Sequence, residues 1–417
     1  MRVRRSKRVV LTALFAGTAL AVAGCGTAGG GEDGGQNLKL VVAQYTEDTK
    51  PYWDGLIEKF ENEHPGASID LQVIDWGNLQ SQVNTMIQTQ QIPDILNINL
   101  FADYAESDLL YRADELMSPE QLEDFLPTFA ENASYNGEQY AFPFVGTVNG
   151  LYYNKTIFAE AGIEKPPATW EEFLTAAEKI KALPGDYVPY ALALGTEGGH
   201  YEFGTWARSN GGGWMTGEDW TINDPRNVET LEFLKTLTNR GFTQANPGQT
   251  NRADGTWPLF AQGKAAMVYG SFGTRAFMEP VRKAGIDFGI STHPTQHGAE
   301  PATHGVQDYL MAFRKDGNQQ LVSDFLAYFY QPGNYVEYLR TEGLLPTTSS
   351  AAEQFAQDPE TAEFVDLIPQ ARFDPTSEPV WAQLSGTMGS QLGTGVNSDA
   401  QPRKLLTSFQ DIAEAAN

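Results

Sequence analysis

Three histidines near residue 300 have a spacing that could bind a metal. His293 and His297 lie four residues apart and His304 follows. Two imidazoles four residues apart on a helix can bind zinc together. However, Pro294 and Gly298 disfavour a helix there, and no Glu follows His293 directly. We therefore expect three histidines in surface loops and no metal site.

Carboxylates and a Ser-containing glycine loop are the next candidates for catalysis. Glu47 and Asp48 could act as the paired carboxyls of a glycosidase, but with 53 Asp and Glu chance proximity is common. The run from Gly270 to Gly273 is one residue too short for a nucleophile elbow, and the sequence has no P-loop pattern. We expect no enzyme activity and no cofactor; an extracellular glycosidase is the alternative from another functional class.

The aromatic residues are suited to a different chemistry. The sequence contains 23 Phe, 17 Tyr and 8 Trp. Flat rings pack on the apolar C–H faces of a sugar, whereas Asn, Asp, Glu and Arg side chains bind its hydroxyl groups. Large hydrophobic cores would also use many rings, so the number of rings leaves both interpretations open.

Alternating strands and helices must position these residues. Short apolar strands with amphipathic helices between them are expected at residues 38–43, 69–73 and 92–98. This order predicts a parallel sheet with right-handed crossovers, in which ligands bind at the carboxyl ends of the strands. Farther along, Thr169 and Glu172 predict a capping box at a helix start, and residues 228–237 and 321–329 have helical periodicity. We find no repeat and no long linker after residue 38.

The first residues are typical of an export signal rather than of a folded domain. Five Arg and Lys residues precede an apolar stretch from Val9 to Ala23, which is short for a membrane span. The sequence Val22-Ala23-Gly24-Cys25 resembles a bacterial lipobox, although an ordinary signal peptide with an incidental Cys is also open. We expect a lipoprotein signal peptide at 1–24, a lipid anchor at Cys25 and a Gly-rich flexible tether at 25–37.

Composition excludes several classes of protein. The formal net charge of -25 argues against a nucleic-acid partner, because phosphate recognition needs a basic surface. A single Cys excludes a disulfide framework and a Cys-based zinc cluster. A hydrophobic content of 41% excludes a wholly disordered chain.

Several segments, in order along the chain, resemble those of a known family. They are residues 140–155 (YAFPFVGTVNGLYYNK), 166–173 (PPATWEEF) and 260–267 (FAQGKAAM), with Pro93-Asp94-Ile95, Ser209-Asn210-Gly211-Gly212 and Gly343-Leu344-Leu345-Pro346. Together they resemble the sugar-binding lipoproteins of bacterial ABC importers, the extracellular solute-binding proteins that include maltose-binding protein. The resemblance extends from residue 38 to nearly the end of the chain.

This resemblance implies a two-lobed α/β periplasmic-binding-protein-like fold with a hinge and a ligand cleft between the lobes. Lobe 1 would hold residues 38–145 and 294–332, and lobe 2 residues 146–293 and 333–417. The implied function is to capture a carbohydrate, expected to be an oligosaccharide, outside the cell and to deliver it to an ABC transporter permease. The protein would act as a monomer, held by its lipid anchor on the outer face of the cell membrane. A polyamine, glycerol phosphate or another small solute is the alternative ligand.

The same resemblance places ligand contacts in loops after strands and in the hinge strand. The expected contacts are Glu47, Asp48, Trp76, Asn99, Thr147, Asn149, Trp206, Trp214, Phe272, Asp308 and Trp381. The sequence departs from the family pattern at three positions. Thr147 stands where a Glu is common, and the lost carboxylate argues against a maltodextrin-type contact there. Phe272 stands where many relatives have Trp, and His304 where a glycine is common.

Overall fold

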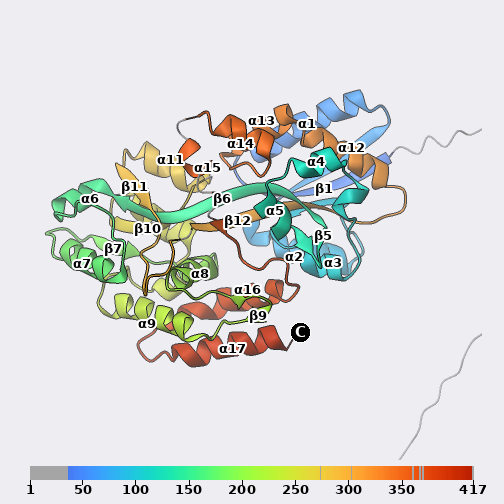
Figure 1. Cartoon of the computed structure of the whole chain (residues 1–417). Helices are drawn as coiled ribbons and strands as arrows, with labels where there is room; N and C mark the ends of the chain where they lie inside the picture. The colour runs from blue at the N-terminus through green and yellow to red at the C-terminus, as the bar shows by residue number, and fades with distance from the viewer. Residues whose placement is uncertain are drawn as a thin grey trace, which may run out of the picture. The chain divides into compact units, whose positions relative to one another are not determined.

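The fold is built on a mixed sheet of nine strands within the described residues (Figure 1). The structure is a computed structural model that describes residues 36–415, except 273, 302, 359–360, 366–367 and 369–370. The strands of this sheet are β1 (Gln36–Gln44), β2 (Ala67–Asp75), β3 (Ile95–Ile98), β6 (Ala141–Asn154), β7 (Val188–Ala191), β10 (Ala265–Phe272), β11 (Phe288–Ser291), β12 (Thr303–Ala312) and β13 (Ala371–Arg372). Two small hairpins join β4 (Ser134–Tyr135) to β5 (Glu138–Gln139) and β8 (Met215–Thr216) to β9 (Asp219–Trp220).

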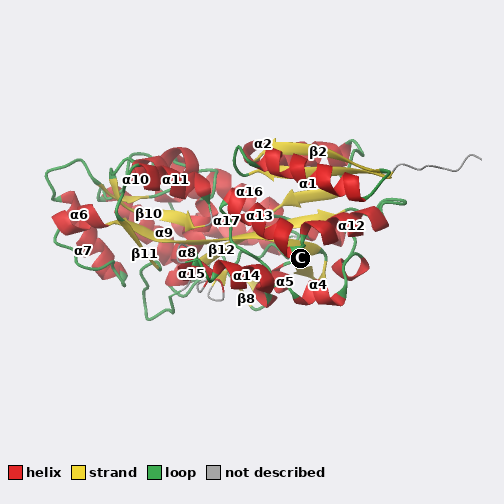
Figure 2. Cartoon of the chain, turned by 90° about the horizontal axis from the view of Figure 1, so that it is seen from above, coloured by secondary structure: helices red, strands yellow, loops and turns green. Residues whose placement is uncertain are grey.

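Helices lie on both sides of the strands (Figure 2). They are α1 (Thr49–Glu63), α2 (Trp76–Gln88), α3 (Ala102–Glu106), α4 (Pro119–Glu123), α5 (Pro127–Asn132), α6 (Lys155–Glu160), α7 (Trp170–Lys181), α8 (Gly199–Ser209), α9 (Pro225–Asn239), α10 (Trp257–Ala261), α11 (Arg275–Lys283), α12 (Gln319–Phe329), α13 (Pro332–Glu342), α14 (Ser349–Phe355), α15 (Ala362–Val365), α16 (Trp381–Gln391) and α17 (Pro402–Glu414). In the part of the chain that the structure describes, none of these helices has the length and apolar character of a membrane span.

The strand order is β2-β1-β3-β12-β6-β10-β7, with β11 on β6 and β13 on β12. The predicted parallel arrangement of the first three strands is confirmed, because β1 pairs in parallel with both β2 and β3. Strand β6 then pairs antiparallel with β12 along most of its length, and with β10 and β11 toward its end. Thus β6 and β12 are shared by the two ends of the sheet.

Two hydrophobic clusters cover each end of the sheet. At the β1 end, helices α1, α12, α13 and α14 bury one cluster around Trp53, whose ring stacks on Phe329 at 5.0 Å between centroids. Helices α2 and α3 pack on the other face. At the β10 end, one cluster includes α7, α8, α9, α16 and α17, and another includes α10 and α11.

This packing differs from the predicted lobe boundary near residue 332. Tyr335, Tyr338 and Phe355 are buried in the same cluster as Trp53 at the β1 end. Residues 335–355 therefore share a core with the first lobe, although the prediction placed them in the second. The remaining lobe assignments stay a prediction.

Local signals explain how α7 starts. The Thr169 hydroxyl accepts a hydrogen bond from the Glu172 backbone N–H, as the predicted N-cap requires. The Glu172 carboxylate differs from a simple capping box, since it accepts from the backbone N–H of Ala168 at 2.7 Å. The predicted signal peptide, Cys25 and all of the tether except 36–37 lie outside the described residues, and 36–37 belong to β1.

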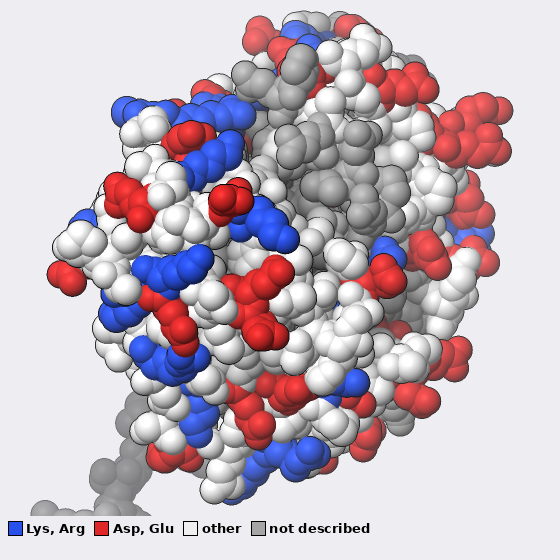
Figure 3. Space-filling model, turned by 60° about the vertical axis from the view of Figure 1, so that its left-hand side comes forward, with Lys and Arg blue, Asp and Glu red and all other residues white. Residues whose placement is uncertain are grey.

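The surface charge is mixed in sign on the face seen in Figure 3. Lys and Arg side chains are interspersed there with Asp and Glu side chains. The net charge of -25 therefore gives no single acidic patch on this face that would mark a binding surface.

Candidate ligand site

A pocket of about 190 Å³ lies among segments from both ends of the sheet. Asn99 and Leu100 follow β3, and Gly305, Val306 and Gln307 belong to β12. The other lining residues are Asn132, Thr196, His200, Tyr201, Phe373, Asp374, Thr376, Trp381, Ser385 and Gly386. We call this the first pocket; its wall consists mainly of amides, hydroxyls and aromatic rings.

A second pocket of about 700 Å³ adjoins the first. The two pockets share Asn132, Phe373 and Asp374 in their walls. The second pocket is also lined by Arg208 and Trp214 of the α8–β8 region and by the 299–301 segment. A ligand larger than one small ring could therefore extend past Phe373 and Asp374.

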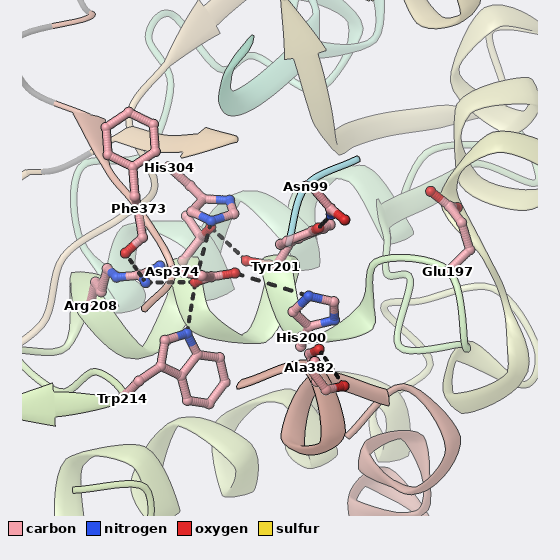
Figure 4. Close-up of polar contacts among 12 residues, drawn as sticks. Asn99, Glu197, His200, Tyr201, Arg208, Trp214, His304, Phe373, Asp374 and Ala382 are labelled. Atoms are coloured by element: carbon pink, nitrogen blue, oxygen red, sulfur yellow. Dashed lines mark hydrogen bonds and ion pairs between the residues drawn. The ribbon is translucent and has the colours of Figure 1, made fainter. Parts of the chain in front are cut away.

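The Asp374 carboxylate lies at the centre of a buried polar cluster (Figure 4). Its Oδ1 accepts hydrogen bonds from Arg208 Nη2 at 2.7 Å and from Trp214 Nε1 at 2.8 Å. His304 Nε2 lies 3.5 Å from Oδ1, and His200 Nε2 lies 4.0 Å from Oδ2. Burial alone would raise the pKa of Asp374, but His304 and Arg208 outweigh it and hold that pKa well below its usual range. The carboxylate is therefore ionised at neutral pH.

The two imidazoles near this carboxylate are neutral at pH 7. Burial lowers the pKa of His200 to about 4, and it also lowers the pKa of His304. The Nδ1 of His304 is 2.7 Å from the Tyr269 hydroxyl, which fixes the ring in place. The cluster thus contains the Asp374 carboxylate paired with the Arg208 guanidinium.

The Tyr201 ring lies at the contact between the two ends of the sheet. Asn99 Nδ2 donates to the Tyr201 hydroxyl at 3.1 Å, so a side chain after β3 meets one on α8. The Arg252 guanidinium lies 5.1 Å from the centroid of the Tyr201 ring and pairs with Glu197 at 2.6 Å. These contacts hold the ring as part of the pocket wall.

A buried carboxylate fixes the start of α8, which carries His200 and Tyr201. The Glu202 side chain is fully buried and accepts hydrogen bonds from the Tyr190 hydroxyl at 2.5 Å and from Ala193 N–H at 2.9 Å. Gly198 precedes the helix with φ of 80°, a left-handed conformation that favours glycine. Burial raises the pKa of Glu202 to about 8, so this carboxyl group is mostly protonated in the folded protein at pH 7.

The structure brings three of the predicted contacts to the pockets. Asn99 and Trp381 line the first pocket, and Trp214 lines the second. Trp381 is only 2% exposed, with its ring parallel to that of Trp220 at 6.4 Å between centroids and close to that of Trp214. Its ring is therefore packed mainly against other rings, and little of it is accessible to a ligand.

The acidic residues after β1 lie elsewhere. Glu47 is exposed, and Asp48 accepts from Arg275 at 2.9 Å in an ion pair with α11. Neither residue lines the two pockets.

Asp308 on β12 is buried and accepts a hydrogen bond from the Tyr45 hydroxyl at 2.6 Å, and burial raises the pKa of Asp308 to about 7. This carboxyl links β12 to the end of β1.

The prediction for Trp206 is wrong. Its side chain is fully buried in the core at the β10 end, and its indole N–H donates to the Tyr190 hydroxyl at 3.0 Å. The α8 turn that carries Trp206 faces the core, because the residue lies five positions beyond Tyr201 and thus on another side of the helix.

Trp76, Thr147 and Asn149, which were also predicted contacts, are not among the residues that line the two pockets. The Trp76 ring meets Tyr45 edge-on at 5.6 Å, and Thr147 is half-buried on β6. Asn149 is buried and donates to the backbone carbonyl of His304 at 3.0 Å. The side chain of Phe272 lies outside the described residues.

Sequence reasoning missed most of the residues that define the pockets. The pocket-lining residues His200, Tyr201, Phe373 and Asp374 were not among the expected contacts. Their signal is weak: Asp374 is one acid among 53, and only the following Pro375 hints at a fixed loop. The clearest indication of a pocket in the sequence is at 198–201, where a histidine and a tyrosine follow two glycines.

The expectation that the three histidines lie in surface loops is wrong for two of them. His293 is 2% exposed and packs edge-on against Trp206, and His304 is 1% exposed in the Asp374 cluster. Only His297 is exposed, and its Nε2 contacts Glu229 at 3.0 Å. Their sequence spacing does not bring the three rings to one site.

Comparison with known proteins adds the family. Residues 55–363 match the family model described as bacterial extracellular solute-binding protein. A binding protein of Brucella abortus (strain 2308) is 27% identical over 91% of this chain and 92% of its own. The sn-glycerol-3-phosphate-binding periplasmic protein UgpB of the same organism is 30% identical over 52% of this chain and 51% of its own.

A solved structure has the same fold. It is an ABC transporter solute-binding protein from Thermotoga lettingae bound with alpha-D-tagatose, with a TM-score of 0.79 and 19% identity. The match covers 91% of this chain and 99% of that one, which confirms the predicted α/β periplasmic-binding-protein fold. With the family model matched over residues 55–363, the chain belongs to the bacterial extracellular solute-binding proteins, which bind their solutes and are not enzymes.

Proposed function

We propose that this protein binds a neutral carbohydrate in the first pocket and delivers it to an ABC transporter permease. One observation carries the proposal: among the described residues that line this pocket there is no Lys or Arg, while amides, hydroxyls and rings come from both ends of the sheet. Sugar hydroxyl groups need donors and acceptors, and the C–H faces of a sugar need rings. Tyr201 and Phe373 are the two half-buried rings in this wall.

The size of the ligand is part of the proposal. The first pocket is small, but the second opens beside it and shares three wall residues with it. We propose an oligosaccharide with one unit in the first pocket and the next beyond Phe373. Tagatose in the structural relative supports a sugar ligand for this fold, since that protein is described as bound with it.

A glycerol phosphate ester is the second candidate, favoured by the partial match to UgpB. The buried charges near the pockets argue against it, although the exposed Arg372 also lines the second pocket. Arg208 pairs with Asp374 at 2.7 Å, and Arg252 pairs with Glu197 at 2.6 Å, so both buried cations are already neutralised. An incoming phosphate would also meet the ionised Asp374 carboxylate, and repulsion between like charges in a buried site is strong.

Thermal unfolding with a panel of candidate ligands tests the proposal. The panel contains D-glucose, D-tagatose, maltose, maltotriose, glycerol 3-phosphate and spermidine. A ligand that binds only the folded state at 100 times its Kd stabilises it by about 2.7 kcal/mol and raises the midpoint. We expect a shift with at least one neutral sugar and none with glycerol 3-phosphate. A shift with glycerol 3-phosphate or spermidine alone would show that the ligand class is wrong.

The cellular location is proposed as well. Export followed by lipid attachment at Cys25 would keep the binding domain beside its permease, on the outer face of the membrane. The lipobox-like sequence Val22-Ala23-Gly24-Cys25 supports this, and the Gly-rich residues after it provide a tether.

A further inference from the structure

A carboxylate and a guanidinium lie together at the boundary between the two pockets. Asp374 lines both pockets, and Arg208 lines the second. Their side chains are 3% and 13% exposed, and one hydrogen bond of 2.7 Å joins Asp374 Oδ1 to Arg208 Nη2. We call these two residues the boundary pair.

Hydrogen bonds to neighbouring residues hold both side chains of the boundary pair in place. Arg208 Nη2 also donates to the backbone carbonyl of Phe373 at 3.0 Å, and Trp214 Nε1 donates to Asp374 Oδ1. Each charged group is therefore held through one of its terminal atoms, Oδ1 of Asp374 and Nη2 of Arg208. The loop that carries Phe373 and Asp374 is tied to α8 in the same way.

The other terminal atom of each charged group has no hydrogen-bond partner within the described protein, although His200 Nε2 lies 4.0 Å from Asp374 Oδ2. These atoms are Asp374 Oδ2, an acceptor, and Arg208 Nη1, a donor. Leaving a buried charged group unsatisfied costs free energy, so each such group in a native structure calls for an explanation, and a bound ligand is one. Both residues line the second pocket, so a single ligand in that pocket has the free acceptor and the free donor in its wall.

We infer that the boundary pair selects a ligand with two neighbouring hydroxyl groups, one donating to Asp374 Oδ2 and the other accepting from Arg208 Nη1. This inference rests on the proposed carbohydrate function and deepens it. A sugar ring presents such pairs of adjacent hydroxyls, each of which can donate and accept.

Other ligand groups match the boundary pair less well. An ammonium group has donors only, so it would satisfy Asp374 and leave the Arg208 donor unused. A phosphate has mainly acceptors, so it would satisfy Arg208 and be repelled by Asp374. A lone hydroxyl would satisfy one atom. Sites built to bind a hydroxyl reject analogues that lack it, since the protein groups then stay unpaired.

Isothermal titration with deoxy sugars tests this inference. The probe is the panel sugar with the lowest dissociation constant for the wild-type protein, whether D-glucose, D-tagatose, maltose or maltotriose, together with its monodeoxy analogues. Two variants change the boundary pair, Asp374→Asn and Arg208→Lys. The matched control is Asp70→Asn, which makes the same chemical change in an exposed carboxylate of β2 that lines neither pocket.

In the wild-type protein and the control, removing one hydroxyl of an adjacent pair should weaken binding by about 10- to 100-fold, as for hydrogen bonds to charged groups. In Asp374→Asn, removing the hydroxyl that donates to Asp374 Oδ2 should weaken binding by less than about threefold, because the variant lacks this acceptor. In Arg208→Lys, removing the neighbouring hydroxyl, which accepts from Arg208 Nη1, should likewise weaken binding by less than it does in the wild type. Circular dichroism confirms that each variant folds.

Two results would overturn the inference, and they are distinguishable. If the wild type binds a neutral sugar and both variants keep the full penalty for every missing hydroxyl, the boundary pair acts only structurally and the inference fails alone. If the wild type binds no neutral sugar of the panel, the proposed function fails and the inference fails with it.

Discussion

The buried carboxyl of Glu202 makes the stability of this protein depend on pH in a predictable direction. Burial raises its pKa from 4.5 to about 8 in the folded protein. Between these values the folded state binds a proton that the unfolded state does not. The group therefore contributes its full stabilisation below about pH 4.5, and this is lost progressively as the pH rises toward 8.

The size of the effect follows from the two pKa values. Each unit of pKa difference corresponds to about 1.4 kcal/mol, so a difference of about 3.5 gives at most roughly 5 kcal/mol between pH 4.5 and 8. Glu202→Gln removes the titrating group and retains an oxygen that can accept from Tyr190 or from Ala193 N–H. The variant should lack this part of the pH dependence.

Urea unfolding of the wild type and Glu202→Gln at pH 5, 6, 7 and 8 measures the effect. The unfolding free energy of the wild type relative to the variant should fall by about 1 kcal/mol per pH unit. Asp308, whose pKa is also raised, to about 7, contributes equally to both proteins and cancels. Glu232→Gln, at an exposed position on α9, is the control and should leave the pH dependence unchanged. A difference that stays constant from pH 5 to 8 would refute the reasoning.

Four further outcomes are expected. Gly305→Ala should weaken sugar binding at least tenfold by titration, since its Cβ would lie 2.5 Å from the Phe373 ring and displace it. Asn99→Ala should also weaken binding at least tenfold, because it removes the bond to Tyr201 and a pocket amide; unchanged affinity would place the site elsewhere. Cys25→Ser should leave an unprocessed or membrane-free protein on cell fractionation. Small-angle scattering should show a smaller radius of gyration with bound sugar, as lobe closure requires.

The order of elements could be predicted because it depends on local patterns. The strands expected at 38–43 and 69–73 correspond to β1 and β2, and the helix expected to start at Thr169 corresponds to α7. Each signal lies within a few residues of the element that it specifies. The assignment of 335–355 failed because it depends on packing between distant segments, with Tyr338 against Trp53.

The site could be predicted only in part for the same reason. Asn99 was found because it follows a recognisable strand, and ligands bind beyond such ends. Asp374 was missed because its role comes from Arg208 and Trp214, 166 and 160 residues away along the chain. No local pattern distinguishes it from the other acids. Trp206 shows the converse error, since an aromatic residue near a predicted loop can serve the core.

The cost of burying charge explains why these distant residues are tied together so firmly. An isolated buried carboxylate would take up a proton, but His304 and Arg208 keep Asp374 ionised, and the hydrogen bond from the Trp214 indole helps to fix its orientation. A site whose polar groups are already oriented loses less entropy when a ligand binds, so more of the interaction free energy appears as affinity. The same bonds attach the 373–374 loop to α8, and Glu202 attaches α8 to the segment after β7. Through this series of contacts the β10 end of the sheet sets the position of the acceptor that a sugar would meet.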